Sequence, residues 1–561
     1  PHTRSGEIAV HRLETKAQAA VRGLRFVCAR SSCPPLSVSV MFRLSMFTSL
    51  RIAARSLRRR GRTTLLSVGG LSIGVAVCLL AGLYVWTQYS YDHHHAAADR
   101  IVRIHEESAA YTYDEVWFDL TDNFPGDARA TAFVPRSGVV QTRTEDTSAD
   151  ASTAHERARR VDRLYYASPS VFDVFTYPLA QGDPATALQD PASAVLSHEM
   201  AQAFFPDQNP IGRTIAVPGE DDLRTLTVTG VMEPLPQTLH VRPDLLVPLE
   251  NLKRESGGYF AWMYVYVRIA GGTTAGDVTA WLNERRTARQ EKSGQAREVT
   301  PLRAQPLLNI YLHSDLREEI APTGSFTYVL AFGVVGLLVL VIACVNYIIM
   351  TTAQVAERMR SVGLRKTFGA TRGQVARHFL AESALVTGLS VAVGVGLTSL
   401  AVPGVNRLAP DPIMLERLWS LEGAFLVLGI TLLTTLLAGA YPATYLSALQ
   451  PVRLFRGGAT SRGDAALQRG LVVLQFALSI ALTAVTVVVV QQTQYVAQKD
   501  LGLDREHTLM VNTRFAGSFG EYGVLSTEER RRRLDRIETA LEQQSDVRAT
   551  GRMAYRPNSD Y

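Results

Sequence analysis

The chain has 561 residues, 47% of them hydrophobic and 20% charged, and a formal net charge of +6. These totals exclude an ordinary soluble protein, because several stretches of 20 or more residues contain no Asp, Glu, Lys or Arg while a long middle section is rich in charge. They do not indicate nucleic-acid binding either, since residues 88–326 hold 22 Lys and Arg against 33 Asp and Glu, and the basic excess lies in short segments beside the apolar stretches.

Residues 1–40 show no sustained apolar periodicity and no signal-peptide core. We expect residues 1–45 to be a disordered leader or translated upstream sequence, with the true start at Met41 or Met46. Cys28 and Cys33 form a lone C-x4-C pair without a second pair of ligands, which is weak evidence for zinc. No metal site is predicted from them.

Five apolar spans follow, each long enough to cross the roughly 30 Å hydrocarbon core of a bilayer as a helix. They cover about residues 64–86, 328–350, 379–402, 423–446 and 471–490. Six arginines lie between residues 51 and 62, and basic clusters also follow the second and fourth spans. Because Lys and Arg concentrate in cytoplasmic loops, this pattern predicts a cytoplasmic N-terminus, an extracytoplasmic block at residues 88–326, and a second extracytoplasmic stretch at residues 491–561.

Individual residues inside the spans predict how the helices pack. The glycines that suit close helix packing are Gly74, Gly388, Gly394 and Gly396. Pro442 should kink the fourth span near its cytoplasmic end. Glu382 lies one turn into the third span, and two interpretations remain open: a helix-end residue that reaches headgroups or water, or a contact with another helix or subunit.

The extracytoplasmic block mixes strand and helix patterns. Residues 226–231 and 263–268 alternate as half-buried strands do. Residues 273–292 carry charge at helical spacing, and Ser197 to Phe205 is predicted to be a short helix capped by Ser197. The block is long enough for one or two α+β subdomains.

The motifs of common enzymes are missing from this block. It contains no G-x-S-x-G, H-E-x-x-H or C-x-x-C motif, and the whole chain contains no G-x-x-x-x-G-K-[ST]. We therefore predict no catalytic residue, no cofactor and no ATP binding through a P-loop of its own. His93, His94 and His95 raise a metal site as one interpretation, but three consecutive histidines do not face one ion, and a structural junction where the span enters the outer block is the other.

A long-range internal repeat links the first and fifth spans. The segments 60–61, 71–73 and 87–89 (Arg-Gly, Leu-Ser-Ile and Thr-Gln-Tyr) recur at 469–470, 478–480 and 493–495. The fifth span is thus predicted to open a second copy of the unit. A full copy would need three further spans, so we expect the chain to be truncated.

Several motifs resemble the permease subunits of ABC transporters of the MacB/FtsX-like family, also called type VII or mechanotransmission permeases. They lie at residues 50–60 and 70–74, at 90–101, at 194–213 with 228–240, at 356–370, and at 440–457. The most specific match is Ala356-Glu-Arg-Met-Arg-Ser-Val-Gly-Leu-Arg-Lys-Thr-Phe-Gly-Ala370. The resemblance covers about residues 46–515, and its departures are modest: Val102 replaces an aromatic residue, and Ser361-Val362 replaces Glu-Ile.

The loop at residues 356–377 has two interpretations. It combines six cations and one acid with apolar residues at helical spacing, which alone predicts an amphipathic helix on anionic lipid. The resemblance implies instead a coupling helix that docks on a cytoplasmic ATP-binding subunit, with a turn at Gly369 and Thr371 before the third span. The residues assigned to this coupling are Glu357, Arg358, Arg360, Gly363, Leu364, Arg365, Lys366, Gly369 and Ala370.

The predicted protein is a polytopic α-helical membrane protein with a large extracytoplasmic α+β domain of the MacB-like periplasmic core type. Its predicted segments are a leader (1–45), the cytoplasmic entry and first span (46–87), the core domain (88–326), an FtsX-like permease domain with the coupling loop (327–456), a linker and fifth span (457–490), and a truncated second domain (491–561).

The resemblance implies the permease subunit of an ABC export or mechanotransmission system in the bacterial inner membrane. Its implied partners are a cytoplasmic ATP-binding subunit that hydrolyses ATP, a second permease unit (a homodimer or a tandem repeat), the lipid bilayer and a candidate periplasmic adaptor. One alternative is a membrane sensor or regulator that controls an envelope hydrolase or a peptide response, and another is a membrane-anchored extracytoplasmic enzyme. Partner identity separates the first alternative from a transporter.

Overall fold

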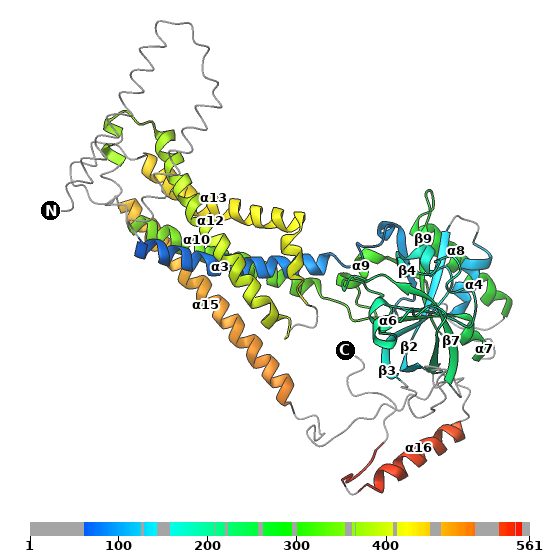
Figure 1. The fold of residues 1–561 in the computed structure, drawn as a ribbon. Coiled ribbons are helices and arrows are strands. Elements are labelled where there is room, and N and C mark those ends of the chain that lie inside the picture. Colours follow the sequence, from blue (N-terminus) through cyan, green and yellow to red (C-terminus); the bar gives the residue numbers. More distant parts are fainter. Residues whose placement is uncertain are drawn as a thin grey trace. The chain divides into compact units, whose positions relative to one another are not determined.

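The computed structural model describes most of the chain between residues 61 and 551. The described residues are 61–124, 128–142, 157–206, 208–218, 223–255, 262–293, 300–353, 362–364, 366–407, 412–448, 462–499, 527–544 and 546–551. The chain divides into two compact units, Pro1–Ala81 with Val335–Gln491 and Gly82–Val334 with Gln492–Tyr561. The first unit contains most of the long apolar helices and the second contains a β-sheet (Figure 1).

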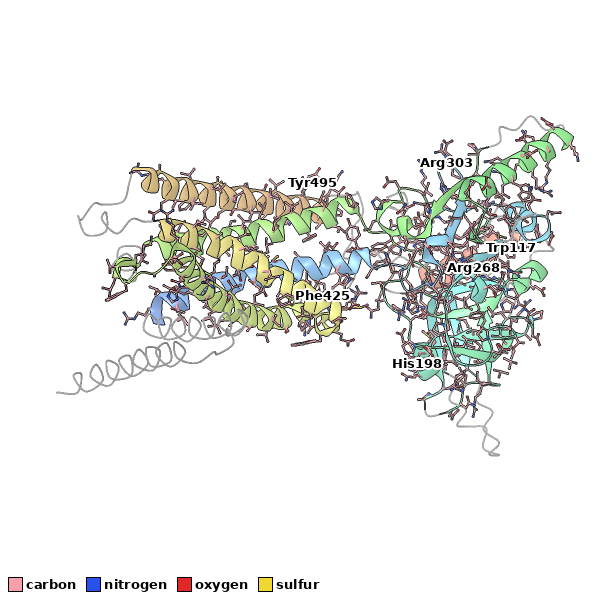
Figure 2. The ribbon with its side chains drawn as sticks, turned by 90° about the horizontal axis from the view of Figure 1, so that it is seen from above. Trp117, His198, Arg268, Arg303, Phe425 and Tyr495 are labelled. Carbon is pink, nitrogen blue, oxygen red and sulfur yellow. The ribbon has the colours of Figure 1, made fainter. Side chains whose placement is uncertain are left out.

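Within the described residues, five helices are long and apolar enough to cross a membrane. They are α3 (Gly61–Tyr89), α10 (Phe326–Ala353), α12 (Arg372–Val405), α13 (Leu421–Ala448) and α15 (Arg462–Gln498). Each of the five predicted spans falls on one of them, because a backbone in lipid must satisfy its own hydrogen bonds and a helix does so within one segment. Phe425 of α13 and Tyr495 of α15 project from their helices and are largely exposed (Figure 2).

Close helix packing in the first unit depends on small residues. A Cβ added at Gly74 of α3 would overlap the Cβ of Ala343 on α10, and one added at Gly394 of α12 would lie 2.8 Å from Cγ1 of Val75. The packing prediction is therefore confirmed at these two glycines. At Gly388 and Gly396 an added Cβ meets no described atom within 4 Å, so close packing at these two glycines stays a prediction.

The structure tests the prediction for Glu382 but not the one for Pro442. Glu382 is only 5% exposed within the first unit, which favours its interpretation as a contact with another helix over a residue that reaches headgroups. Helix α13 continues through position 442 to Ala448. A bend at Pro442 stays a prediction.

The second unit holds a ten-stranded mixed sheet in the order β10-β1-β9-β2-β3-β8-β5-β7-β4, with β6 beside β2 and β7. The strands are β1 (Ile101–His105), β2 (Ala128–Thr142), β3 (Arg157–Ala167), β4 (Leu179–Gln181), β5 (Ser193–Leu196), β6 (Thr214–Pro218), β7 (Leu223–Met232), β8 (Leu245–Pro248), β9 (Tyr264–Ile269) and β10 (Arg303–Pro306). The chain from 98 to 313 that carries this sheet is called the sheet domain below. The two strands predicted from the sequence are confirmed as β7 and β9.

Helices cover both faces of the sheet (Figure 1). They are η1 (Ala98–Arg100), α4 (Asp114–Asp122), α5 (Val171–Val174), α6 (His198–Phe204), α7 (Glu250–Glu255), α8 (Ala275–Ser293) and α9 (Leu307–His313); elsewhere lie η2 (Leu415–Trp419) and α16 (Thr527–Glu542). The predicted helices at 273–292 and 197–205 are confirmed as α8 and α6. The Ser197 cap is confirmed too, since its hydroxyl accepts a hydrogen bond from the Met200 N–H.

Two separate cores follow from the alternation of side chains along the strands. In β9, Val265 and Val267 join one core with apolar residues of α4, α6 and α8. Tyr264 and Tyr266 point the other way and join a second core with residues of α5 and α9. The second core lies on the face of the sheet where the chain arrives from α3 and leaves for α10.

Candidate functional site

The root of the sheet domain is where α3 ends and the approach to α10 begins. We define the root as residues 88–95, Arg103, residues 238–240 and residues 311–319. Helix α3 ends at Tyr89, where the Ser90 hydroxyl donates to the carbonyl of Thr87 over 2.8 Å. This last turn belongs to the same compact unit as the sheet domain.

Tyr311 of α9 fastens the last turn of α3. Its hydroxyl donates a hydrogen bond of 2.7 Å to Oε1 of Gln88, and its ring stacks on Tyr91. Gly324, just before α10, passes so close to this group that an added Cβ would lie 2.7 Å from the Tyr311 ring and 3.0 Å from Gln88 Oε1. The end of α3 and the approach to α10 therefore meet at one tyrosine.

Asp92 and His95 join the exit of α3 to two loops of the sheet domain. The Asp92 N–H donates to the carbonyl of Thr238 over 2.9 Å, and its Oδ1 accepts from the His240 N–H over 2.8 Å. His95 Nδ1 accepts from the Thr176 N–H over 3.1 Å. Asp92, with a φ of +61°, adopts a left-handed backbone that is uncommon outside glycine but tolerated by Asp.

The three consecutive histidines do not share an environment. His95 is 3% exposed, whereas His93 and His94 lie on the surface. Among the described residues, no group of three or more His, Cys, Asp or Glu could hold a metal ion. The arrangement favours the interpretation of this segment as a structural junction.

Burial shifts the titration of the residues in this junction. It raises the pKa of Asp92 to about 7, although the hydrogen bond from the His240 backbone acts in the opposite direction. Burial lowers the pKa of His95 to about 3, with the charge of His94 adding to the effect. It also lowers the pKa of His240 to about 3, with Arg103 adding to it. The neutral form of each side chain is thus favoured by its surroundings.

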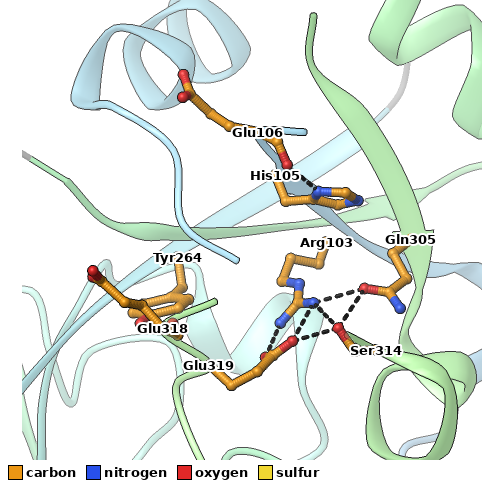
Figure 3. A network of polar contacts seen from close by, with 8 residues as sticks. All are labelled: Arg103, His105, Glu106, Tyr264, Gln305, Ser314, Glu318 and Glu319. Carbon is orange, nitrogen blue, oxygen red and sulfur yellow. Dashed lines mark hydrogen bonds and ion pairs between the residues drawn. The ribbon is translucent and has the colours of Figure 1, made fainter. Parts of the chain in front are cut away.

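Arg103 is buried in the middle of β1 and binds the segment that leads to α10 (Figure 3). Its guanidinium forms a two-pronged ion pair with Glu319, with one contact of 2.9 Å from Nη2 to Oε1. Nη2 also donates to Gln305 Oε1 over 2.6 Å and to Ser314 Oγ over 3.1 Å. Burial acts to lower the pKa of Arg103, but the hydrogen bonds and charges of Glu319 and Tyr266 outweigh it, and the pKa is raised.

The sequence analysis did not single out Arg103 as a buried, paired charge, although the residues around it indicate one. The strand Ile-Val-Arg-Ile-His has hydrophobic neighbours on both sides of the arginine, and all five residues are buried. A charge in such a strand needs a partner, because an unpaired buried charge is costly. The identity of the partner, 216 residues away, carried no comparable signal.

The coupling loop (356–377) is described in part, and it lies in the first unit. Glu357, Arg358, Arg360 and Arg365 lie outside the described residues. The predicted coupling residues that the structure does describe are Gly363, Leu364, Lys366, Gly369 and Ala370.

Part of this loop is anchored and part is exposed. Val362 is buried against Val375, Phe379 and Ala443. Leu364 and Phe368, one helical turn apart, are 58% and 84% exposed. The described part of the loop therefore presents an exposed apolar pair, while Val362 is packed against α12 and α13.

The turn before α12 has the predicted form. Gly369 has a φ of +89°, which only glycine adopts without strain. Thr371 then caps α12 in a capping box: its N–H donates to Gln374 Oε1 over 3.0 Å, and the Gln374 N–H donates to the Thr371 hydroxyl. The predicted turn at Gly369 and Thr371 is confirmed.

Two family models match this chain. The model described as the MacB-like periplasmic core domain matches residues 64–285, and the one described as the FtsX-like permease C-terminal matches residues 333–451. The first match covers α3 and most of the sheet domain. The second covers most of α10, the coupling loop, α12 and α13.

Curated relatives match about half of the chain. The macrolide export ATP-binding/permease protein MacB of Neisseria gonorrhoeae is 24% identical over 284 residues, which are 50% of this chain and 41% of the relative. The ABC transporter permease YknZ of Bacillus subtilis is 22% identical over 265 residues, which are 47% of this chain and 61% of that one. The chain thus spans less than two thirds of the length of either relative.

Solved structures of similar proteins match part of the chain. The periplasmic region of MacB from Actinobacillus actinomycetemcomitans has a TM-score of 0.27 at 17% identity, over 38% of this chain and 92% of that one. The extracellular domain of YknZ from Gram-positive bacteria has a TM-score of 0.25 at 14% identity, over 36% and 99%.

Proposed function

The chain belongs to the MacB/FtsX-like family of ABC transporter permeases, which are helical membrane proteins with a large extracytoplasmic domain, and we propose that it couples ATP hydrolysis on a separate cytoplasmic subunit to movement of that domain. In this proposal the protein lies in the bacterial inner membrane with its N-terminus in the cytoplasm. It works with a second permease unit, in export or in transmission of force across the cell envelope.

The observation that carries the proposal is the exposed apolar pair of the coupling loop. Leu364 and Phe368 project from a short helical turn that Val362 anchors on one side and the capped start of α12 holds on the other. An exposed apolar pair on an anchored turn, in a segment whose sequence is rich in basic residues, is the chemistry of a docking site for another protein. A helix that merely lay on lipid would need no fixed turn.

The root gives a physical route for transmission at the other end of the spans. Gln88 at the end of α3 and the approach to α10 both contact Tyr311, and β1 is tied to the approach to α10 through Arg103 and Glu319. In the proposed cycle, closure of two ATP-binding subunits moves the paired coupling loops. Packed helices then carry that movement to the root as a shift between two discrete arrangements.

The test measures how the full chain binds a co-expressed cytoplasmic ATP-binding subunit and stimulates its ATPase activity. The double variant Leu364→Asp with Phe368→Asp should lose co-purification by about tenfold or more, because two anchors of the interface become charged. Leu223→Asp is the matched control: an apolar residue of the sheet domain with 47% exposure, whose change should leave binding intact.

Two outcomes contradict the proposal. If the double variant binds and stimulates the ATPase as the wild type does, the coupling loop is not the docking site. If no ATP-binding subunit associates with any form of the chain, the regulator alternative takes precedence over the transporter.

A further inference from the structure

The sheet domain has two connections to the apolar helices, residues 90–97 after α3 and residues 314–325 before α10. Among the described residues other than glycine, two have a positive φ, and one lies in each connection: Asp92 at +61° and Glu318 at +55°. This left-handed conformation is sterically unfavourable for a residue with a Cβ. Such residues persist where the surrounding structure holds them, and they are concentrated at sites that switch between conformations.

Glu318 is held in this conformation through its backbone (Figure 3). Its carbonyl accepts a hydrogen bond of 2.5 Å from the Tyr264 hydroxyl, and the next residue, Glu319, forms the ion pair with Arg103. The side chain of Glu318 itself is exposed, and it has no hydrogen bond or ion pair among the described residues. The contacts of its neighbours therefore impose the positive φ.

The residue before Glu318 is fixed to the sheet domain as well. The Arg317 N–H donates to the carbonyl of Ser108, and the Ala110 N–H donates to the carbonyl of Arg317, each over 3.0 Å. We call Glu318 with these bonds and the one from Tyr264 the α10 joint. The left-handed residue thus lies between two points at which the chain is attached.

Asp92 is held at three points in the other connection. Its N–H donates to the carbonyl of Thr238 over 2.9 Å, and its carbonyl accepts from the His95 N–H over 3.2 Å. Its Oδ1 accepts from the His240 N–H over 2.8 Å. We call Asp92 with these bonds the α3 joint. Both joints belong to the same compact unit as the sheet domain.

We propose that Asp92 and Glu318 are the two residues at which the sheet domain is fastened to and released from its helix connections. Each joint has a fastened state, in which the bonds above hold φ positive, and a released state, in which those bonds are broken and φ returns to negative values. The reversal of φ changes the direction of the chain, so the two states are discrete arrangements of the connection.

This inference rests on the proposed function in one respect, since coupling to ATP hydrolysis supplies the force that releases the joints. The strain in the fastened state is a property of the sheet domain unit alone. It is therefore measured without any partner, and the use of the joints in the ATPase cycle is measured separately.

The first experiment compares glycine with alanine at each joint, by hydrogen exchange of the full chain in lipid nanodiscs, corrected for intrinsic rates. Both substitutions remove the same polar groups, so their comparison isolates the backbone. The amides of Ala110 and Arg317 report opening of the α10 joint, and the amide of His95 reports opening of the α3 joint. The same pair of substitutions at Asp315 is the control, because Asp315 is exposed in the same connection as Glu318 and has no positive φ.

The sign of the difference is what identifies strain. With an ordinary φ, glycine opens more readily than alanine because it gains more freedom in the released state, so Asp315→Gly should open about threefold more than Asp315→Ala. With a positive φ the Cβ of alanine disfavours the fastened state. We therefore expect Glu318→Gly and Asp92→Gly to open about threefold less than their alanine counterparts. Glycine that opens as readily as alanine, or more readily, at either joint would overturn the proposal.

The second experiment adds a co-expressed ATP-binding subunit and follows the same amides with ADP and during ATP turnover. Exchange at both joints should rise severalfold during turnover in the wild type, and less in Glu318→Gly, which favours the fastened state. Unchanged exchange in a complex that hydrolyses ATP contradicts release of the joints. A subunit that does not bind the chain contradicts the proposed function instead, and the difference between glycine and alanine remains a valid test of the strain.

Discussion

Tyr311 stacks on Tyr91 with ring centroids 3.4 Å apart and planes within 5° of each other, and these two residues lie 220 positions apart in the sequence. The hydroxyl of Tyr311 also donates a hydrogen bond to Gln88 at the end of α3. A single side chain of α9 thus holds the exit of one predicted span while Gly324, before the next span, passes against its ring.

Tyr311→Phe tests this attachment. The change leaves the buried Oε1 of Gln88 without its donor, so we expect a loss of about 1–3 kcal/mol in the free energy of unfolding of the sheet domain. Tyr113→Phe is the control, because Tyr113 is 40% exposed and its hydroxyl loses little. Urea unfolding of the full chain, followed by tyrosine and tryptophan fluorescence, measures the difference. Equal midpoints for the two variants would show that the Gln88 contact contributes nothing.

The buried ion pair between Arg103 and Glu319 predicts strong non-additivity. Arg103→Met leaves Glu319 without its cation, and Glu319→Gln leaves Arg103 buried without its anion, so each single change should cost about 3–5 kcal/mol. The double variant should cost less than the sum of the two, because no unpaired charge remains. Unfolding free energies in a double-mutant cycle give the coupling directly, and a coupling near zero would contradict the prediction.

An exposed pair in the same domain supplies the control for that cycle. Arg160 and Asp162 form an ion pair in which the side chains are 61% and 68% exposed. Exposed pairs are worth about 0–1 kcal/mol, so Arg160→Met should hardly change stability.

The sequence predicts the individual helices and strands of this protein better than it predicts which of them contact one another. The five spans are visible because a bilayer requires long apolar runs, and β7 and β9 are visible because side chains alternate along a half-buried strand. The order of ten strands depends on pairings far apart in the chain, which no local pattern specifies. The root depends on such pairings too: nothing in the sequence around Tyr311 or Glu319 indicates which residues they contact.

The sequence also does not indicate which face of a membrane-spanning helix contacts its neighbour. Gly388, Gly394 and Gly396 all lie in the same predicted span, but they lie on different faces of α12, and of the three only Gly394 has an α3 atom near an added Cβ among the described residues. Which glycine is a contact is decided by where the neighbouring helix lies. The sequence therefore predicts that some glycine of this span packs closely and cannot say which one.

Gly394→Val and Gly388→Val form a matched pair on one helix. The added methyls at position 394 collide with Val75 of α3, so we expect a loss of about 1–3 kcal/mol, the usual effect of overpacking. A Cβ added at Gly388 meets no described atom within 4 Å, so Gly388→Val should have little effect. Thermal unfolding in one detergent compares them, and equal melting temperatures would contradict the packing assigned to Gly394.

Gly369 allows a direct test of whether the rigid turn matters for coupling. Its φ of +89° suits glycine, is tolerated by asparagine and is strongly disfavoured for a β-branched residue. Gly369→Val should therefore shift the turn that carries Leu364 and Phe368, and lower ATPase stimulation of the partner subunit severalfold, while Gly369→Asn retains most of it. Gly373→Val is the control, since Gly373 lies in the first turn of α12 with no described neighbour within 4 Å of an added Cβ and no positive φ. If Gly369→Val stimulates the ATPase as well as Gly373→Val does, the shape of this turn is not what the partner recognises, and the anchored side of the loop around Val362 would have to carry the interaction instead.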